Sequence, residues 1–113
     1  MKKTEMLKKN YEFKNVLSKG KFFKGKEIEI FLLKNNKKRN LLGIAVGTKN
    51  GKAFQRNKAK RLIREAYKNL EERIKNGYSI VVLLKKDIDI NDIKYIDILN
   101  EMENTFKKAN IIS

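Results

Sequence analysis

The densest cluster of cationic side chains lies between Lys49 and Arg64, a segment with seven Lys and Arg residues and no carboxylate. Three of the chain's five arginines lie in this segment, Arg56, Arg61 and Arg64, although lysine is the prevailing cation. A guanidinium group is planar and can donate two parallel hydrogen bonds to a phosphate or stack on a base. The segment therefore predicts a surface that binds a polyanion, with nucleic acid as the leading candidate.

The distribution of charge along the chain agrees with this reading. The formal net charge is +15, but residues 1–64 carry 20 Lys and Arg against four acidic residues, whereas residues 65–113 carry eight against nine. Charge that served only solubility would have no reason to be separated in this way. We therefore expect the polyanion to lie on one side of the molecule.

A helix is expected to present the cluster. Apolar residues recur at helical spacing from Ala59 to Ile74, and Asn76 with Gly77 would end the helix. Its start stays open between three residues: Asn50, Gly51 and Asn57. The face opposite the apolar stripe carries five cations: Arg56, Lys60, Arg61, Arg64 and Lys68. Cations near a helix N-terminus oppose the macrodipole at ~0.3–1 kcal/mol each, so a bound phosphate would compensate them. The alternative is an ordinary solvated helix face.

The remaining pattern predicts strands and two further helices. Residues 22–33 alternate as a strand, with Ile28, Ile30 and Leu32 on one face and Phe31 on the other. Residues 35–40 indicate a turn, 41–48 a second strand, and 78–84 a strand buried on both faces. Asn10 would cap a first helix that Gly20 stops, with residues 1–9 as a basic, flexible arm. A last helix would open at Asn91 or Asp92 and carry Ile93, Ile96, Leu99, Met102 and Phe106.

These elements predict one α+β domain over residues 1–113, an α/β sandwich with a mixed central sheet. The order strand, helix, buried strand indicates a crossover that pairs the second and third strands in parallel. In the second strand Leu42, Ile44 and Val46 would face the core. Gly43, Ala45 and Gly47 would leave its other face nearly bare, as where a ligand comes close.

Phe31 and that small-residue face suggest a second site. If the two strands are neighbours, an aromatic ring stands beside a shallow floor, which suits a single-stranded nucleic acid whose bases stack at ~1–3 kcal/mol each. Phe31 could equally pack under a helix, and Phe13 could belong to the core, to this cleft or to both.

Several other chemistries are disfavoured. The chain has no cysteine and no histidine, which removes disulfides, the usual zinc ligands and the usual general base. GTKNGK from Gly47 is one residue short of a phosphate loop, and the acidic residues from Asp87 lack the glycine and glutamate of a calcium loop. The longest apolar run, 80–84, is too short to span a bilayer. We expect a cytoplasmic protein that binds no membrane and no metal through its own side chains.

The order Gly51, Ala53, Arg56, Asn57, Lys60, Arg61, Ile63 and Arg64 resembles the signature of the bacterial ribonuclease P protein subunit. That family's motif runs arginine, asparagine, arginine at its centre, and here Lys58 stands in the third place. The flanking elements are similar over nearly the whole chain. The resemblance implies a sheet with a left-handed crossover, like domains of ribosomal proteins and elongation factors, a handedness that sequence patterns alone would not predict.

The resemblance also implies a function. The chain would be the non-catalytic subunit of the endoribonuclease that removes the 5′ leader of precursor transfer RNA, with Mg²⁺-dependent hydrolysis carried out by the RNA subunit. Its partners would be that RNA and precursor transfer RNA, not DNA. The residues implied to contact the catalytic RNA are Lys52, Arg56, Asn57, Lys58, Lys60, Arg61 and Arg64. Those implied to line a leader cleft are Phe13, Leu17, Phe31 and Lys49.

Two other functions stay open on the residues alone. One is a general RNA-binding module, such as a ribosomal protein or an RNA chaperone, without a role in cleavage. The other is a nuclease that acts without an RNA subunit, for which the acidic residues between Asp87 and Asp92 would be the candidate metal ligands.

Overall fold

A computed structural model describes residues 1–112, and its centre is a five-stranded sheet in the order β1-β4-β5-β3-β2. The strands are β1 (Thr4–Met6), β2 (Lys21–Lys24), β3 (Ile28–Lys34), β4 (Asn40–Ala45) and β5 (Tyr78–Leu84). The α-helices are α1 (Asn10–Lys19), α2 (Ala53–Leu70) and α3 (Tyr95–Lys108). Three short 3-10 helices, η1 (Thr48–Asn50), η2 (Glu71–Arg73) and η3 (Ile90–Asp92), connect them.

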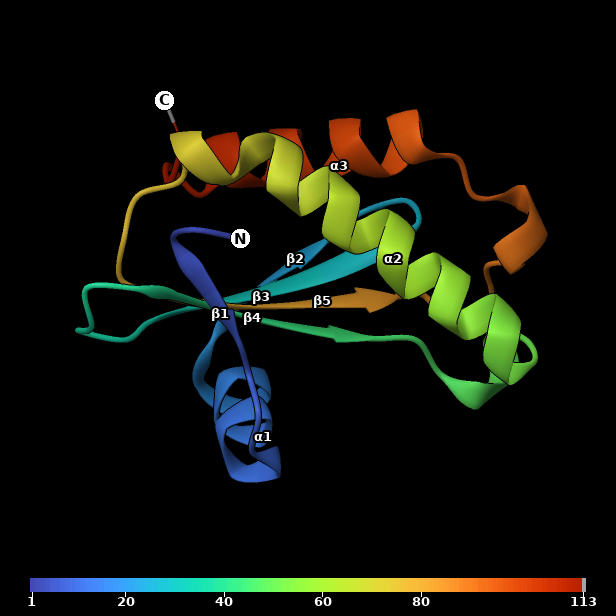
Figure 1. Cartoon of the computed structure of the whole chain (residues 1–113), viewed down its shortest axis with the longest axis horizontal. Helices are drawn as coiled ribbons and strands as arrows, with labels where there is room; N and C mark the ends of the chain where they lie inside the picture. The colour runs from blue at the N-terminus through green and yellow to red at the C-terminus, as the bar shows by residue number, and fades with distance from the viewer. Residues whose placement is uncertain (113) are drawn as a thin grey trace.

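The elements form three layers. Figure 1 shows α2 and α3 together over one face of the sheet and α1 alone on the other face. β4 pairs in parallel with both β1 and β5, whereas β3 pairs antiparallel with β5 and β2. The α+β class with a mixed sheet is confirmed, and so is the parallel pairing around the helical crossover.

The crossover through α2 is left-handed. β1 lies nearest the viewer in Figure 1, so the strand order places β4 in front of β5. The chain runs to the right along β4, rises to the helix layer, returns to the left through α2 and enters β5 behind β4. This counterclockwise path recedes from the viewer, which defines a left-handed turn. Such a connection is rare, because a right-handed crossover fits the twist of parallel strands better.

The core lies between the sheet and the pair α2 and α3. Ile28, Ile30 and Leu32 of β3 point into it as the alternation predicts, each less than a tenth exposed. From α2 the buried side chains are Ala59, Ile63, Ala66, Tyr67 and Leu70. From α3 they are Ile98, Met102 and Phe106, whereas Ile96, one of the apolar residues expected on this helix, is 54% exposed.

The N-terminal segment corrects the expected flexible arm. Residues 4–6 form β1, and the backbone N–H of Leu7 donates to Leu42 O at 2.8 Å just beyond it. The Thr4 hydroxyl is buried and lies 2.7 Å from the Tyr67 hydroxyl in α2. Backbone pairing with β4 and this buried contact hold a sequence that composition alone describes as a solvated tail.

Other expected boundaries are also wrong. Residues 22–33 are two strands, because the chain reverses at Gly25 to form the antiparallel hairpin of β2 and β3. α2 ends at Leu70, six residues before Asn76, although Ile74 is still buried. α3 starts at Tyr95 rather than at Asn91, which lies in η3. α1 ends at Gly20 as predicted, while Asn10 is its first helical residue and not its cap.

The buried Tyr67 phenol makes stability depend on alkaline pH. Burial raises its pKa to about 12, above the ordinary value of 10. The unfolded chain therefore releases this proton first, so the stabilisation is complete below pH 10 and declines as pH rises to about 12, by up to about 3 kcal/mol. Tyr67→Phe removes the group. We expect urea midpoints to fall less steeply between pH 10 and 12 in this variant than in the wild type, and parallel curves would contradict the assignment.

Candidate RNA interface

The first three turns of α2 carry the predicted cationic cluster, which we call the basic helix face: Lys52, Arg56, Asn57, Lys58, Lys60, Arg61 and Arg64. Lys52 occupies the N-cap position, and its backbone N–H donates to the Gln55 side-chain oxygen at 2.9 Å. Arg56 Nη1 donates to the carbonyl of Gly51 at 2.8 Å, where a φ of +153° favours glycine. α2 therefore begins at Ala53, immediately after a turn that Arg56 stabilises.

The other side chains of the basic helix face have no protein partner. Within residues 1–112, Lys52, Lys58, Lys60, Arg61 and Arg64 form no ion pair and no side-chain hydrogen bond, whereas the outlying Lys68 pairs with Glu65 at 3.4 Å. The first turn of α2 contains no acidic residue. Lys52, at the N-cap, therefore opposes the helix dipole without a compensating carboxylate, and all five cations are available to an external anion.

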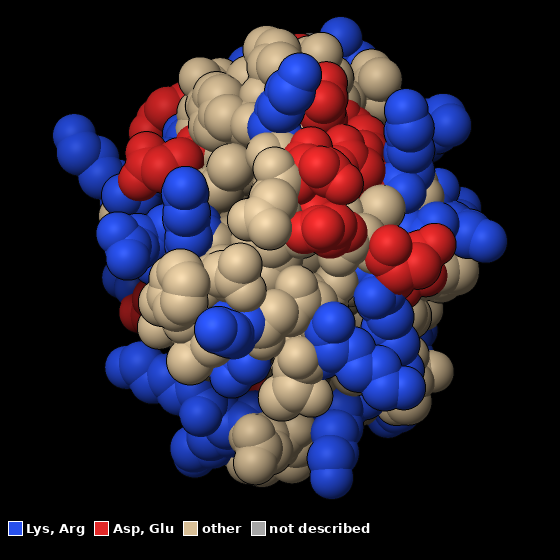
Figure 2. Space-filling model, turned by 90° about the vertical axis from the view of Figure 1, so that its right-hand side faces the viewer, with Lys and Arg blue, Asp and Glu red and all other residues tan. Residues whose placement is uncertain are grey.

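Charge is unevenly spread over the end of the molecule where α2 begins. Figure 2 views this end and shows acidic side chains gathered in its upper part, with Lys and Arg along both flanks and below. Glu27, Asp97 and Glu101 lie together between the β2–β3 turn and α3, where the Glu101 carboxylate accepts from Glu27 N at 2.9 Å. Burial is the largest cause that raises the pKa of Glu27, followed by the negative charges of Glu101 and Asp97. A polyanion would therefore follow the cationic part of this surface.

A second candidate surface is the face of the sheet that α1 partly covers, which we call the sheet face. Strand register aligns Gly43 of β4 with Val81 of β5, Val81 with Phe31 of β3, and Phe31 with Phe22 of β2. Residues directly opposite in register point to the same side of a sheet. Phe22 and Phe31 have ring centroids 4.9 Å apart, and Phe22 is 47% exposed. The aromatic pair is thus open to solvent beside α1.

The floor of this face differs from the prediction. β3 and β4 are not neighbours, because β5 lies between them and supplies the fully buried Val81. Gly43 is also not bare, since the ring of Phe13 from α1 lies against it. Phe13 and Leu17, four residues apart on α1, are both partly exposed. Phe13 therefore packs on the sheet and is partly exposed at the edge of the sheet face, and its role in a leader cleft stays a prediction.

The close approach of Phe13 can be tested at Gly43. A Cβ added there would lie 2.9 Å from two ring carbons of Phe13 and 3.0 Å from Leu7 Cδ1. We expect Gly43→Ala to displace the ring and lower the free energy of unfolding by about 1–3 kcal/mol in urea titrations. Gly47→Ala is the matched control, because its nearest neighbour would be Asn50 Oδ1 at 3.6 Å. Equal effects of the two substitutions would refute the packing argument.

The segment from β4 to α2 connects the two surfaces and contains Lys49, which is exposed in η1. The next residue, Asn50, is buried and was considered only as a helix start. Its Nδ2 donates to Lys85 O at 2.9 Å and to Ile88 O at 2.8 Å. Asn50 thus holds η1 to the loop that follows β5, and it gives Lys49 a defined place beyond the end of β4.

Comparison with known proteins identifies the family. The family model for ribonuclease P matches residues 1–110. The chain belongs to the ribonuclease P protein family. It is 39% identical to the ribonuclease P protein component of Clostridioides difficile over 110 residues, covering 96% of this chain and 95% of the relative. It is 38% identical to that of Fusobacterium nucleatum over 108 residues, covering 94% and 97%.

Solved structures of this ribonuclease P family have the same fold. The RNase P protein of Staphylococcus aureus aligns with a TM-score of 0.82 at 29% identity, covering 96% of this chain and 97% of that chain. The protein from Thermotoga maritima aligns with a TM-score of 0.82 at 28% identity, covering 92% and 96%. The expected family is thus confirmed, and ribonuclease P membership associates the chain with transfer RNA processing and with a ribonucleoprotein nuclease.

Two aromatic residues near the candidate surfaces of this ribonuclease P family member were missed from sequence. Phe22 stands on the sheet face because of the β2–β3 hairpin, and its cross-strand position opposite Phe31 was hidden when one long strand was expected. Phe54 is 69% exposed in the first turn of α2. Its position off the apolar stripe was the available signal.

The described residues form neither a metal site nor a membrane-spanning helix. Across residues 1–112 no group of three or more acidic, histidine or cysteine side chains is placed to hold a metal ion. No helix in the described part of the chain is long and apolar enough to cross a membrane.

Proposed function

We propose that this chain is the protein subunit of ribonuclease P and assists cleavage of the 5′ leader from precursor transfer RNA. The basic helix face binds the catalytic RNA, and the sheet face binds the single-stranded leader. The RNA subunit holds the Mg²⁺ and carries out hydrolysis, so no residue of this chain is a catalytic residue. The complex acts in the cytoplasm.

The observation that carries the proposal is the set of unpaired cations at the start of α2. Within the described chain Lys52, Lys58, Lys60, Arg61 and Arg64 have no side-chain partner. Two of them, Arg61 and Arg64, carry a guanidinium group that can donate two parallel hydrogen bonds to a phosphate. A structured RNA presents closely spaced phosphates that several of these cations can contact at once. Membership of the ribonuclease P protein family favours the catalytic RNA as that partner.

The role of the sheet face rests on its aromatic side chains. Phe22 and Phe31 lie together, and Phe13 and Leu17 border the same face from α1. Unstacked bases of a single strand bind to such rings with little dependence on sequence. Lys49, exposed in the segment that leads to α2, can contact the leader phosphates.

One reconstitution tests the whole proposal. Precursor transfer RNA and a bacterial ribonuclease P RNA are incubated at low Mg²⁺, with and without this protein. We expect cleavage at the leader junction only when both components are present, because neutralised phosphates and an anchored leader reduce the need for Mg²⁺.

The other outcomes separate the alternatives. Unchanged cleavage by the RNA on adding protein would refute the proposal, and binding without stimulation would favour a general RNA-binding module. Cleavage by the protein alone would establish a protein nuclease, for which the acidic residues near Asp89 would be the first to mutate.

A further inference from the structure

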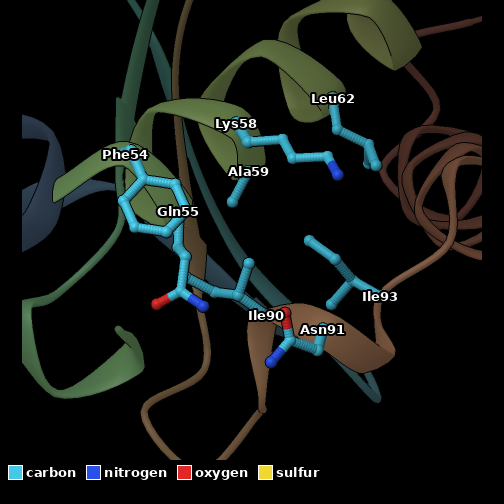
Figure 3. A pocket seen from close by; sticks show the side chains of 8 residues that line it. All are labelled: Phe54, Gln55, Lys58, Ala59, Leu62, Ile90, Asn91 and Ile93. Carbon is cyan, nitrogen blue, oxygen red and sulfur yellow. The ribbon is translucent and has the colours of Figure 1, made fainter. Parts of the chain in front are cut away.

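A cavity of about 180 Å³ lies beside the basic helix face, between the start of α2 and η3. Figure 3 shows the ring of Phe54 on one side, Lys58 and Leu62 along the upper edge, Ile93 on the opposite side and Ile90 with Asn91 below. Pockets for drug-sized ligands typically measure ~300–1,000 Å³. This cavity therefore suits a single planar group.

The polar groups around the cavity are available to a ligand. Among residues 1–112, the Lys58 ammonium and the side-chain amide of Asn91 have no hydrogen-bond or ion-pair partner. The side-chain oxygen of Asn91 points toward the cavity in Figure 3. The walls between them are apolar, from Ala59, Leu62 and Ile90. Apolar walls suit the faces of a nucleobase, and the unpaired amide and ammonium groups suit its polar edge.

The cavity is formed in advance by contacts within the chain. Asp89 Oδ1 accepts from Asn91 N at 2.9 Å and fixes the turn of η3. Asn50 Nδ2 donates to Ile88 O at 2.8 Å and holds the loop that leads into it. Phe54 is nevertheless 69% exposed, so a large apolar side chain contacts solvent at the edge of this cavity. A ring stacked on Phe54 would remove that exposure.

Position and charge identify the occupant. Phe54, Lys58 and Arg61 follow the i, i+4, i+7 spacing of one side of α2, so the cavity lies next to the basic helix face. α2 and α1 cover opposite faces of the sheet, which separates the cavity from the sheet face. An apolar peptide side chain would leave Lys58 and Asn91 unpaired. An RNA strand whose phosphates follow the cations can turn one base into the cavity.

We propose that this cavity binds one unpaired nucleobase of the catalytic RNA, stacked on Phe54 and hydrogen-bonded by Asn91, with Lys58 on an adjoining phosphate. This inference rests on the proposed function, because it assumes that the RNA subunit lies along α2. It adds a base contact to a surface that otherwise offers contacts to phosphate.

The test measures affinity for ribonuclease P RNA at several salt concentrations. Phe54→Ala should weaken binding about tenfold, within the range for one stacked base, and leave the salt slope unchanged because no phosphate contact is lost. Phe54→Tyr keeps the ring and should stay within about twofold of wild type. Asn91→Ala, at an exposed position, should weaken binding by about threefold or more. Ile96→Ala, an exposed apolar control on α3, should have no effect.

Two results would overturn the inference: wild-type affinity in Phe54→Ala, or equal losses in Phe54→Ala and Phe54→Tyr. The source of the base is tested by placing the photoreactive p-azidophenylalanine at position 54 in the enzyme assembled with precursor. A cross-link to the catalytic RNA supports the inference, and a cross-link to precursor alone, or none, overturns it. The proposed function is tested separately by wild-type stimulation of cleavage and by Arg61→Ala, so the two can fail independently.

Discussion

Replacing Arg61 and Arg64 together by Gln should weaken binding of the catalytic RNA at least about tenfold. Neither side chain has a partner within residues 1–112, so the loss reports contacts with RNA and not a broken intramolecular bond. If each arginine contacts one phosphate, the slope of log affinity against log salt should shrink by about 0.7–0.9 per contact. Filter binding across a salt series measures both quantities, and the melting temperature should stay unchanged.

Matched variants separate the effects of charge and geometry. Arg61→Lys keeps the charge but not the guanidinium fork, so it should keep the slope while lowering affinity. Lys108→Gln removes one exposed charge at the other end of the chain and should change neither. Arg56 is less informative, because Arg56→Ala also removes the hydrogen bond to Gly51 O that supports the start of α2. An unchanged slope in the double variant would show that the catalytic RNA contacts another surface.

Phe31→Ala should lower affinity for precursor transfer RNA about five- to 150-fold, while affinity for mature transfer RNA changes little. A stacked base contributes ~1–3 kcal/mol, and mature transfer RNA has no leader to stack. Because the ring of Phe22 contacts that of Phe31, with centroids 4.9 Å apart, Phe22→Ala should produce part of the same loss in affinity. The measurement is a competition titration of the assembled enzyme with both RNAs.

The control for the sheet face is Tyr95→Ala, an aromatic side chain of α3 that is 37% exposed on the other side of the sheet. It should leave both affinities unchanged. Equal losses for precursor and mature transfer RNA in Phe31→Ala would show that the ring supports the fold or contacts the body of transfer RNA. The leader site would then have to be sought away from the sheet face.

The features that local periodicity determines were predictable. Alternation placed Ile28, Ile30 and Leu32 of β3 in the core, and the apolar stripe of α2 located its buried face correctly. The hairpin at Gly25 was missed because alternation is present only from Glu27 onward, and the adjacent Phe22 and Phe23 were read as an extension of the same strand. The end of α2 was missed for a related reason: Ile74 keeps the helical spacing but pairs with Ile112 in an isolated bridge.

What depends on contacts between distant segments was not predictable. Thr4 belongs to a strand only because β4 offers an edge and Tyr67 a buried partner. The insertion of β5 between β3 and β4 changed the floor beneath Phe31 from glycine to Val81. The spacing of the arginines in α2 could be predicted because it depends on the geometry of one helix alone. The cavity beside Phe54 was not predictable, since three of its eight lining residues come from η3 and the residue after it, 28 or more residues beyond Leu62.

The Asn50 amide has a consequence for where an RNA would be cut. It holds the segment between β4 and α2 to the loop after β5, so the distance between the sheet face and the basic helix face is fixed by covalent geometry and two hydrogen bonds. Under the proposed function, one RNA is held at each end of this segment. The protein would then keep the leader at a constant offset from the catalytic RNA.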